Sequence, residues 1–83
     1  MGDEMVTVNS PVMGTFYRAP APGEPALVET GQKIKEGDLV CIIESMKIFT
    51  ELRSEKAGTV GKILVDNEEA VMKNQALIEI IPD

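Results

Sequence analysis

Short β-favouring segments, separated by turn residues, constrain the fold of this chain more than any other feature. No stretch of ten residues or more shows the 3.6-residue period of an amphipathic helix with capping residues. Turn-forming residues stand between most of the segments, as Gly37 and Asp38 do before the third one. Short strands at this spacing indicate an all-β sandwich or barrel. The segments span residues 5–9, 14–18, 39–43, 48–53, 59–65 and 76–81.

The chain also contains an internal repeat. Residues 28–43 align with residues 65–80 at an offset of 37, and the match places Gly37 on Asn74. Both residue types tolerate a positive φ, so the same tight turn is expected in each copy. Chance similarity between two β-rich stretches is the alternative. A true repeat predicts two packed sheets related by a pseudo-twofold axis, because each copy alone would expose an apolar face.

An insertion distinguishes the first copy from the second. Residues 13–16 align with residues 57–60 at an offset of 44, which is seven more than the offset of the later part. Residues 19–25, with the sequence APAPGEP, are also seven in number. Proline has no N–H to donate within a β-ladder, and three prolines restrict the conformations of the loop. We expect a stiff loop that projects from one copy, the alternative being an ordinary long surface loop.

The apolar positions of these segments provide the predicted core. Cys41 is among them and is interpreted as a packing residue. As the single cysteine of the chain, it has no partner for an internal disulfide, which favours a reducing compartment. The predicted core residues are Val12, Phe16, Val28, Ile34, Leu39, Cys41, Ile43, Val60, Ile63, Val65, Val71, Leu77 and Ile80.

Length and charge exclude several classes of partner. The 83 residues correspond to one small domain, residues 1–83. Eight basic residues against 14 acidic ones give a net charge of −6, and no basic patch is present, so a nucleic-acid partner is not expected. The sequence has no apolar run of about 18 residues and no signal peptide, so a membrane partner is not expected either.

The residues that commonly perform chemistry are mostly missing. The sequence contains no histidine, which excludes a Cys/His metal site and a histidine-based catalytic triad. It also lacks a phosphate-binding glycine loop and a nucleophile elbow. We therefore expect a domain that presents a group to enzymes and performs no catalysis itself.

The segment formed by residues 41–51 departs from this plain pattern. Two β-favouring runs are joined by the very short connection Met46-Lys47, without the Gly, Asn or Asp that two-residue hairpins favour. An atypical turn sequence of this kind indicates that these residues were selected for something other than the stability of the turn. We expect Met46, a large apolar residue, to be exposed at the tip of the hairpin. The alternative places Lys47 on an ordinary solvated strand and Met46 in the core.

The residues Glu44-Ser45-Met46-Lys47-Ile48 resemble the biotin-attachment signature of biotin-dependent carboxylases, usually written Glu-Ala-Met-Lys-Met. Ser45 replaces the usual alanine with little change in bulk. Ile48 replaces the second methionine and keeps its apolar character. The resemblance implies that Lys47 carries covalent biotin at the tip of a hairpin, within a motif formed by Glu44, Ser45, Met46 and Ile48.

The resemblance covers nearly the whole chain. Residues 10–17 (SPVMGTFY) are similar to the opening strand of the bacterial and plastid acetyl-CoA carboxylase carrier. Residues 31–38 are similar to its turn before the strand that leads to the lysine, and residues 58–60 with the strand that follows fit its second half. Residues 19–25 resemble its protruding thumb loop, which implies that Lys47 lies on the same side of the domain as this loop. The implied fold is a flattened β-barrel, or barrel-sandwich hybrid, of two pseudo-twofold-related four-stranded sheets.

The resemblance also implies a function. A biotin protein ligase would join biotin to Lys47. Biotin carboxylase and carboxyltransferase would then use the carrier to make malonyl-CoA for fatty acid synthesis, in the cytoplasm or the plastid stroma. The alternatives are a lipoyl carrier domain, which usually shows Asp-Lys-Ala at its site, and an unmodified binding module of the same fold. A carrier for another carboxylase, acting on propionyl-CoA or pyruvate, is disfavoured because such domains generally lack the thumb.

Overall fold

The computed structural model describes residues 5–83, and all its regular elements are strands. None of the described residues forms a helix, so no helix long and apolar enough to cross a membrane is present among them. All six predicted β segments correspond to strands, with ends that differ by at most two residues. The strands are β1 (Val6–Asn9), β2 (Gly14–Tyr17), β3 (Lys33–Ile34), β4 (Leu39–Ser45), β5 (Ile48–Arg53), β6 (Gly58–Ile63), β7 (Ala70–Val71) and β8 (Ala76–Pro82).

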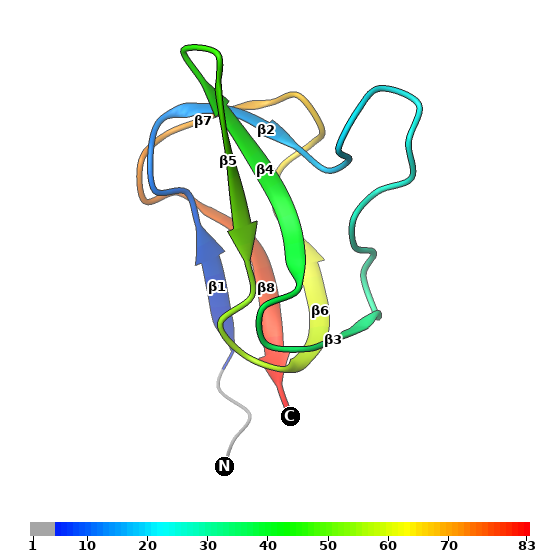
Figure 1. Ribbon diagram of the computed structural model, residues 1–83. Helices are drawn as coiled ribbons and strands as arrows, with labels where there is room; N and C mark the ends of the chain where they lie inside the picture. The colour runs from blue at the N-terminus through cyan, green and yellow to red at the C-terminus, as the bar shows by residue number, and fades with distance from the viewer. Residues whose placement is uncertain (1–4) are drawn as a thin grey trace.

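The strands form two antiparallel four-stranded sheets. The first has the order β1-β8-β6-β3, and the second has the order β5-β4-β2-β7. Figure 1 shows the two sheets stacked, with the β4–β5 hairpin at one end of the molecule and the C-terminus at the other. The two-residue strands β3 and β7 were missing from the sequence-based prediction, because two residues are too few to display a period.

The core lies between the sheets and contains most of the residues predicted for it. Phe16 on β2 pairs with Ile43 on β4, and both are fully buried. Leu39 and Ile63 are only half-buried. The prediction for Val12 is wrong, because this residue lies in the bend between β1 and β2 and is 38% exposed. The predicted core residues that are buried are Phe16, Val28, Ile34, Cys41, Ile43, Val60, Val65, Val71, Leu77 and Ile80.

Two β-bulges explain buried residues that the alternation of side chains did not predict. Val40 is skipped in the pairing of β4 with β5, and Leu77 is skipped in the pairing of β8 with β1. A bulge breaks the alternation, so consecutive side chains can both face the core. Val40 and Cys41 are accordingly both buried, as are Leu77 and Ile78. The two bulges are equivalent under the 37-residue offset.

The hydrogen bonds confirm the internal repeat. The N–H of Asn74 donates to the carbonyl of Ser10 at 2.7 Å, and the N–H of Gly37 donates to the carbonyl of Ser54 at 2.8 Å. Gly37 has a φ of 91° and Asn74 a φ of 71°, so both turns use a left-handed residue at the same position. The predicted equivalence of Gly37 and Asn74 is therefore a property of the fold, and the chance alternative is wrong.

A close backbone approach is repeated as well. A Cβ at Gly14 would overlap the carbonyl oxygen of Glu44, and a Cβ at Gly58 would overlap the carbonyl oxygen of Ile81. Gly14 and Gly58 are equivalent at an offset of 44. Each is the first residue of a central strand and lies against a carbonyl of the strand paired with it, β4 for Gly14 and β8 for Gly58, so both positions require glycine.

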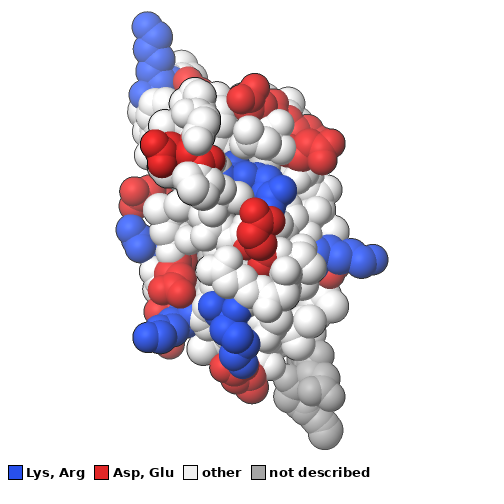
Figure 2. All heavy atoms as spheres, turned by 90° about the vertical axis from the view of Figure 1, so that its right-hand side faces the viewer, with Lys and Arg blue, Asp and Glu red and all other residues white. Residues whose placement is uncertain are grey.

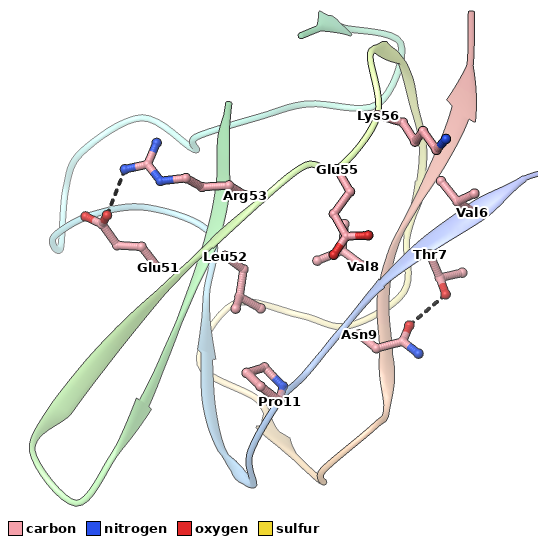
Figure 3. Close-up of a pocket in the computed structure, with 10 residues that line it drawn as sticks. All are labelled: Val6, Thr7, Val8, Asn9, Pro11, Glu51, Leu52, Arg53, Glu55 and Lys56. Carbon is pink, nitrogen blue, oxygen red and sulfur yellow. Dashed lines mark hydrogen bonds and ion pairs between the residues drawn. The ribbon is translucent and has the colours of Figure 1, made fainter. Parts of the chain in front are cut away.

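The two sheets are not hydrogen-bonded to each other, so they do not close into a barrel. β1 and β5 are the outer strands of their sheets and do not pair with each other. A groove of about 460 Å³ runs between them, with Val6, Val8 and Leu52 among its lining residues (Figure 3). Glu51 and Arg53 form an ion pair at 2.8 Å beside it. The flattened barrel is therefore two stacked sheets with an open edge, as expected for a barrel-sandwich hybrid.

Candidate functional site

The β4–β5 hairpin has the two-residue connection predicted from the sequence. Ser45 pairs with Ile48, which leaves Met46 and Lys47 as the turn. Met46 has a φ of 53° and Lys47 a φ of 67°, so both adopt the left-handed conformation of a type I′ turn. Each non-glycine residue in this conformation costs about 1–2 kcal/mol relative to the right-handed one. The turn thus places two costly residues where Asn-Gly would be favoured.

The tip of the hairpin projects into solvent. Met46 is 91% exposed, and Lys47 is also exposed. Among residues 5–83, no carboxylate forms an ion pair with the Lys47 ammonium group. The alternative that buries Met46 in the core is therefore wrong, and the Lys47 amine is open to approach from solvent.

Glu44 is fixed by a neighbouring strand. The Tyr17 hydroxyl on β2 donates a hydrogen bond to Oε1 of Glu44 at 3.0 Å. This hydrogen bond, with smaller contributions from burial and from the charges of Glu44 and Glu68, raises the pKa of Tyr17 above its usual value. The phenol therefore stays protonated and keeps donating at neutral pH. Glu44 and Ser45 are half-buried, while the tip beyond them is open.

The strand that leaves the tip exposes large apolar side chains. Ile48 is 66% exposed and Phe49 is 64% exposed. Sequence reasoning assigned Ile48 to the motif but gave Phe49 no role. The sequence did contain a signal for an exposed apolar side chain here. Ile48 and Phe49 are consecutive, and successive residues of a strand face opposite sides, so both cannot face the core of a regular strand. Exposed apolar residues on an outer strand are typical of a surface that contacts other molecules.

A second feature missed from the sequence is a groove beside the tip. Met13 and Met72, which are 61% and 62% exposed, line it together with Met46. The groove has a volume of about 460 Å³ and is formed where the start of β2, the end of β4 and β7 meet. We call it the methionine groove. Its other lining residues are Gly14, Thr15, Glu44, Ser45, Ala70 and Val71.

The proline-rich loop lies at the same end of the molecule as the hairpin, as expected from the sequence (Figure 1). Its tip is a turn in which the N–H of Glu24 donates to the carbonyl of Ala21 at 3.1 Å. Pro22 and Gly23 occupy the central positions, and Gly23 has a φ of 82°. Proline followed by a left-handed glycine is the sequence of a type II turn, which gives the loop a defined shape.

The base of the loop is also closed. The N–H of Leu27 donates to the carbonyl of Arg18 at 2.7 Å, and the Arg18 guanidinium forms an ion pair with Glu29 at 2.9 Å. Between the loop and the sheet is a hollow of about 210 Å³, which we call the loop hollow. Its lining residues are Tyr17, Ala19, Ala21, Pro22, Gly23, Glu24, Asn67 and Glu68.

The face that carries the loop has a mixed charge. Acidic side chains are spread over it, with isolated basic side chains between them (Figure 2). This face therefore offers no continuous basic surface of the kind that nucleic-acid binding requires.

The described residues offer no metal-binding cluster and no reactive thiol as an alternative functional site. In residues 5–83, no group of three or more His, Cys, Asp or Glu side chains is placed to hold a metal ion. Cys41 is buried, and burial raises the pKa of its thiol to about 12. The thiol is therefore protonated and inert at neutral pH. The chemistry available at this end of the molecule is that of an exposed primary amine on a projecting tip.

Comparisons with known proteins agree on one family. A family model described as "Biotin-requiring enzyme" matches residues 6–80. The biotin carboxyl carrier protein of acetyl-CoA carboxylase from Nostoc sp. is 51% identical over 80 residues. The matched region covers 96% of this chain and 44% of that protein. The corresponding protein from Pseudomonas aeruginosa is 45% identical, with coverage of 89% of this chain and 47% of that one.

Relatives extend to plants and to solved structures. A chloroplastic biotin carboxyl carrier protein of acetyl-CoA carboxylase from Glycine max is 44% identical, over 90% of this chain and 29% of its own length. The crystal structure of Kluyveromyces lactis urea carboxylase matches with a TM-score of 0.77 and 29% identity, covering 95% of this chain and 6% of that one. The chain spans less than half the length of each of these relatives.

Proposed function

The chain belongs to the biotin-requiring enzyme family, and from this premise we propose that it is the biotin-accepting domain of a biotin carboxyl carrier protein, with Lys47 as the residue that carries biotin. The observation that carries the proposal is the exposed two-residue turn, because it presents one amine at the extreme end of a rigid sheet. The matching motif around Lys47 and the names of the similar carrier proteins support it.

In this proposal a biotin protein ligase uses ATP to activate the carboxyl group of biotin, and the Lys47 amine attacks it to form an amide. The amine must lose a proton before it can attack. The ligase must therefore take up the proton. A turn that projects from the sheet supports this step, since an enzyme can surround Lys47 without displacing other parts of the domain.

The motif residues have separate roles in this proposal. Met46, almost fully exposed, provides a large apolar contact for whichever enzyme engages the tip. Ile48 extends this contact along β5. Glu44 and Ser45 hold the base of the turn at the sheet, Glu44 through its hydrogen bond from Tyr17. With Ser45 and Ile48 at the two positions that depart from the usual signature, Lys47 is exposed.

The attached group would act as a carrier arm. Bound biotin supplies the ureido nitrogen that holds the carboxyl group. The flexible stem of Lys47 raises the local concentration of this group at successive active sites. We propose biotin carboxylase and the carboxyltransferase of acetyl-CoA carboxylase as the partners, malonyl-CoA as the product, and the cytoplasm or the plastid stroma as the location. The domain itself remains a carrier without catalytic groups.

Labelling with a purified biotin protein ligase, ATP and biotin tests the proposal. We expect the wild-type domain to bind streptavidin afterwards and Lys47→Ala to lose the signal completely. Lys62→Ala, which removes an exposed lysine from β6, is the matched control and should be labelled like wild type. Persistent signal in Lys47→Ala would overturn the assignment. Modification by a lipoate ligase in place of the biotin ligase would identify the domain as a lipoyl carrier.

A further inference from the structure

The sulfur atoms of this domain differ in their access to solvent. Cys41 carries the single thiol of the chain and is fully buried, so an oxidant in solution does not reach it. Met46 is 91% exposed, which is the highest value among the exposed large apolar side chains of residues 5–83. Oxidation of a sulfur depends on its exposure. Redox chemistry in the folded domain therefore starts at the thioether next to Lys47, in the turn of the β4–β5 hairpin.

We propose that Met46 is a site of reversible oxidation, and that its sulfoxide form makes Lys47 a poor substrate for the biotin ligase. This inference rests on the proposed function and adds a second modification site to the tip of the hairpin. The oxidant is hydrogen peroxide. The product is methionine sulfoxide, which methionine sulfoxide reductases convert back to methionine.

Both directions of the reaction balance. In the forward step, a lone pair on Sγ of Met46 attacks one oxygen of hydrogen peroxide, an S–O bond forms and the O–O bond breaks. The departing hydroxide takes the proton of the transferred oxygen and leaves as water, so the sulfur loses two electrons and the peroxide gains them. In the reverse step, two thiols of the reductase supply two electrons and two protons. The sulfoxide oxygen leaves as water, and the thiols become a disulfide.

The position of Met46 allows this oxidation without damage to the fold. Ser45 pairs with Ile48, so Met46 lies in the connection beyond the last paired residues, at the end of the molecule (Figure 1). A side chain that is 91% exposed has few contacts to lose. A sulfoxide at a buried position would place a polar group among apolar ones, but at the tip its oxygen remains solvated. A change in the reactions of the oxidised domain therefore arises from contacts made by the tip itself.

Oxidation alters the property of Met46 that the proposed contact uses. The thioether is apolar, flexible and polarisable, whereas the sulfoxide is polar and chiral and accepts hydrogen bonds. An enzyme that covers the side chain with apolar groups would have to bury the new oxygen without a partner, which weakens binding. Met46 is bonded directly to Lys47, so this loss affects the enzyme that binds the amine.

The rest of the hairpin tip contains no sulfur. Ile48 and Phe49, which are 66% and 64% exposed, extend the apolar surface along β5 but do not react with peroxide. Met13 and Met72 line the methionine groove together with Met46, but they belong to segments before β2 and after β7. One oxygen atom on Met46 therefore changes the polarity of the tip, whereas oxidation at the other two methionines leaves the tip apolar.

Ligase kinetics after mild peroxide treatment test the proposal. The unbiotinylated domain is treated with hydrogen peroxide, the peroxide is removed, and peptide mass spectrometry measures the oxidation of each methionine. We expect Met46 to be oxidised first. The kcat/KM of the ligase for the domain oxidised at Met46 should fall about tenfold, mainly through KM, because an unpaired acceptor replaces an apolar contact. Treatment with a methionine sulfoxide reductase should restore the original value.

Two leucine variants assign the effect to one residue. Each variant is compared with its own untreated sample, so that a different starting rate does not affect the comparison. Met46→Leu removes the sulfur at the tip, so peroxide should leave its kcat/KM unchanged. Met5→Leu is the matched control, because Met5 is 50% exposed and precedes β1, and its response to peroxide should equal that of wild type. Thermal unfolding of the oxidised wild-type domain should match that of the untreated one.

The outcomes are distinguishable. Failure of the ligase to label the untreated domain would reject the proposed function, and the inference with it. Normal labelling of the domain oxidised at Met46 would overturn the inference alone. A peroxide-dependent loss of labelling in Met46→Leu would assign the sensitivity to another methionine and would overturn it as well. A lowered unfolding temperature would attribute the loss to damage of the fold, and failure of the reductase to restore labelling would contradict reversibility.

Discussion

The two halves of this domain share their framework and differ at two places. β1 to β4 and β5 to β8 correspond strand by strand, including the bulges and the left-handed turns. The position equivalent to Met46 is Asp83, which lies at the opposite end of the molecule from the β4–β5 hairpin (Figure 1). The comparison separates the residues that build the fold, which occur twice, from those proposed to carry the function, which occur once.

The loop is the second departure from symmetry. Removal of residues 19–25 would leave Arg18, Ala26 and Leu27 consecutive, which matches Lys62, Ile63 and Leu64 in the other half. The hydrogen bond from Leu27 to Arg18 already closes the base of the loop. The loop is thus an addition to a complete framework. The following experiments test whether the shared residues determine stability and the unique ones determine function.

The largest effect on stability is expected at the paired glycines. Gly14→Ala and Gly58→Ala each bring a Cβ into a backbone carbonyl, of Glu44 and Ile81 respectively. Overpacking of this kind costs about 3 kcal/mol, and the cost should be similar in both halves. Gly61→Ala, whose Cβ would lie 3.3 Å from the nearest carbonyl oxygen, is the control and should cost under about 1 kcal/mol. Urea unfolding measures all three, and clearly unequal losses at Gly14 and Gly58 would break the symmetry.

A smaller loss is expected at the paired serines. The buried hydroxyl of Ser10 donates to the carbonyl of Val12, and that of Ser54 donates to the carbonyl of Lys56. Ser10→Ala and Ser54→Ala each leave a carbonyl without its partner and should cost about 1–2 kcal/mol. Thermal unfolding of the two variants would contradict the shared framework if only one of them were destabilised.

A gain in stability is expected at the tip. Met46→Asn replaces a methionine at a φ of 53° by a residue that tolerates this conformation, which should stabilise the domain by about 1 kcal/mol. The same variant should slow labelling or carboxyl transfer, because the exposed apolar contact is lost. A gain in stability with unchanged rates in both assays would show that methionine at this position serves no partner.

The smallest effect on stability is expected for deletion of residues 19–25. The variant should unfold within about 1 kcal/mol of wild type, because the loop contributes no buried apolar side chain to the core. It should still be biotinylated, while carboxyl transfer by the partner enzymes, or the choice between biotin and lipoate, should suffer. An unfolded variant would make the loop part of the framework, and full turnover with unchanged cofactor choice would make it passive.

The comparison also explains what the sequence could predict. The repeat, the insertion and the hairpin were predictable because turn residues and offsets are local patterns. The bulges at Val40 and Leu77 were not, because they depend on the pairing of strands. Exposure of Val12 was missed since a bend interrupts the alternation there. The methionine groove could not be predicted from local pattern, because Met13, Met46 and Met72 meet only after both sheets have formed.

Peptide mass spectrometry tests the central claim most directly. The domain would be expressed in cells that contain biotin, lipoate and both ligases, then digested and mapped. We expect one biotinyl group, located on the side chain of Lys47, and no modification of the other lysines. A lipoyl group on Lys47, a biotinyl group on another residue, or an unmodified Lys47 under these conditions would contradict the account.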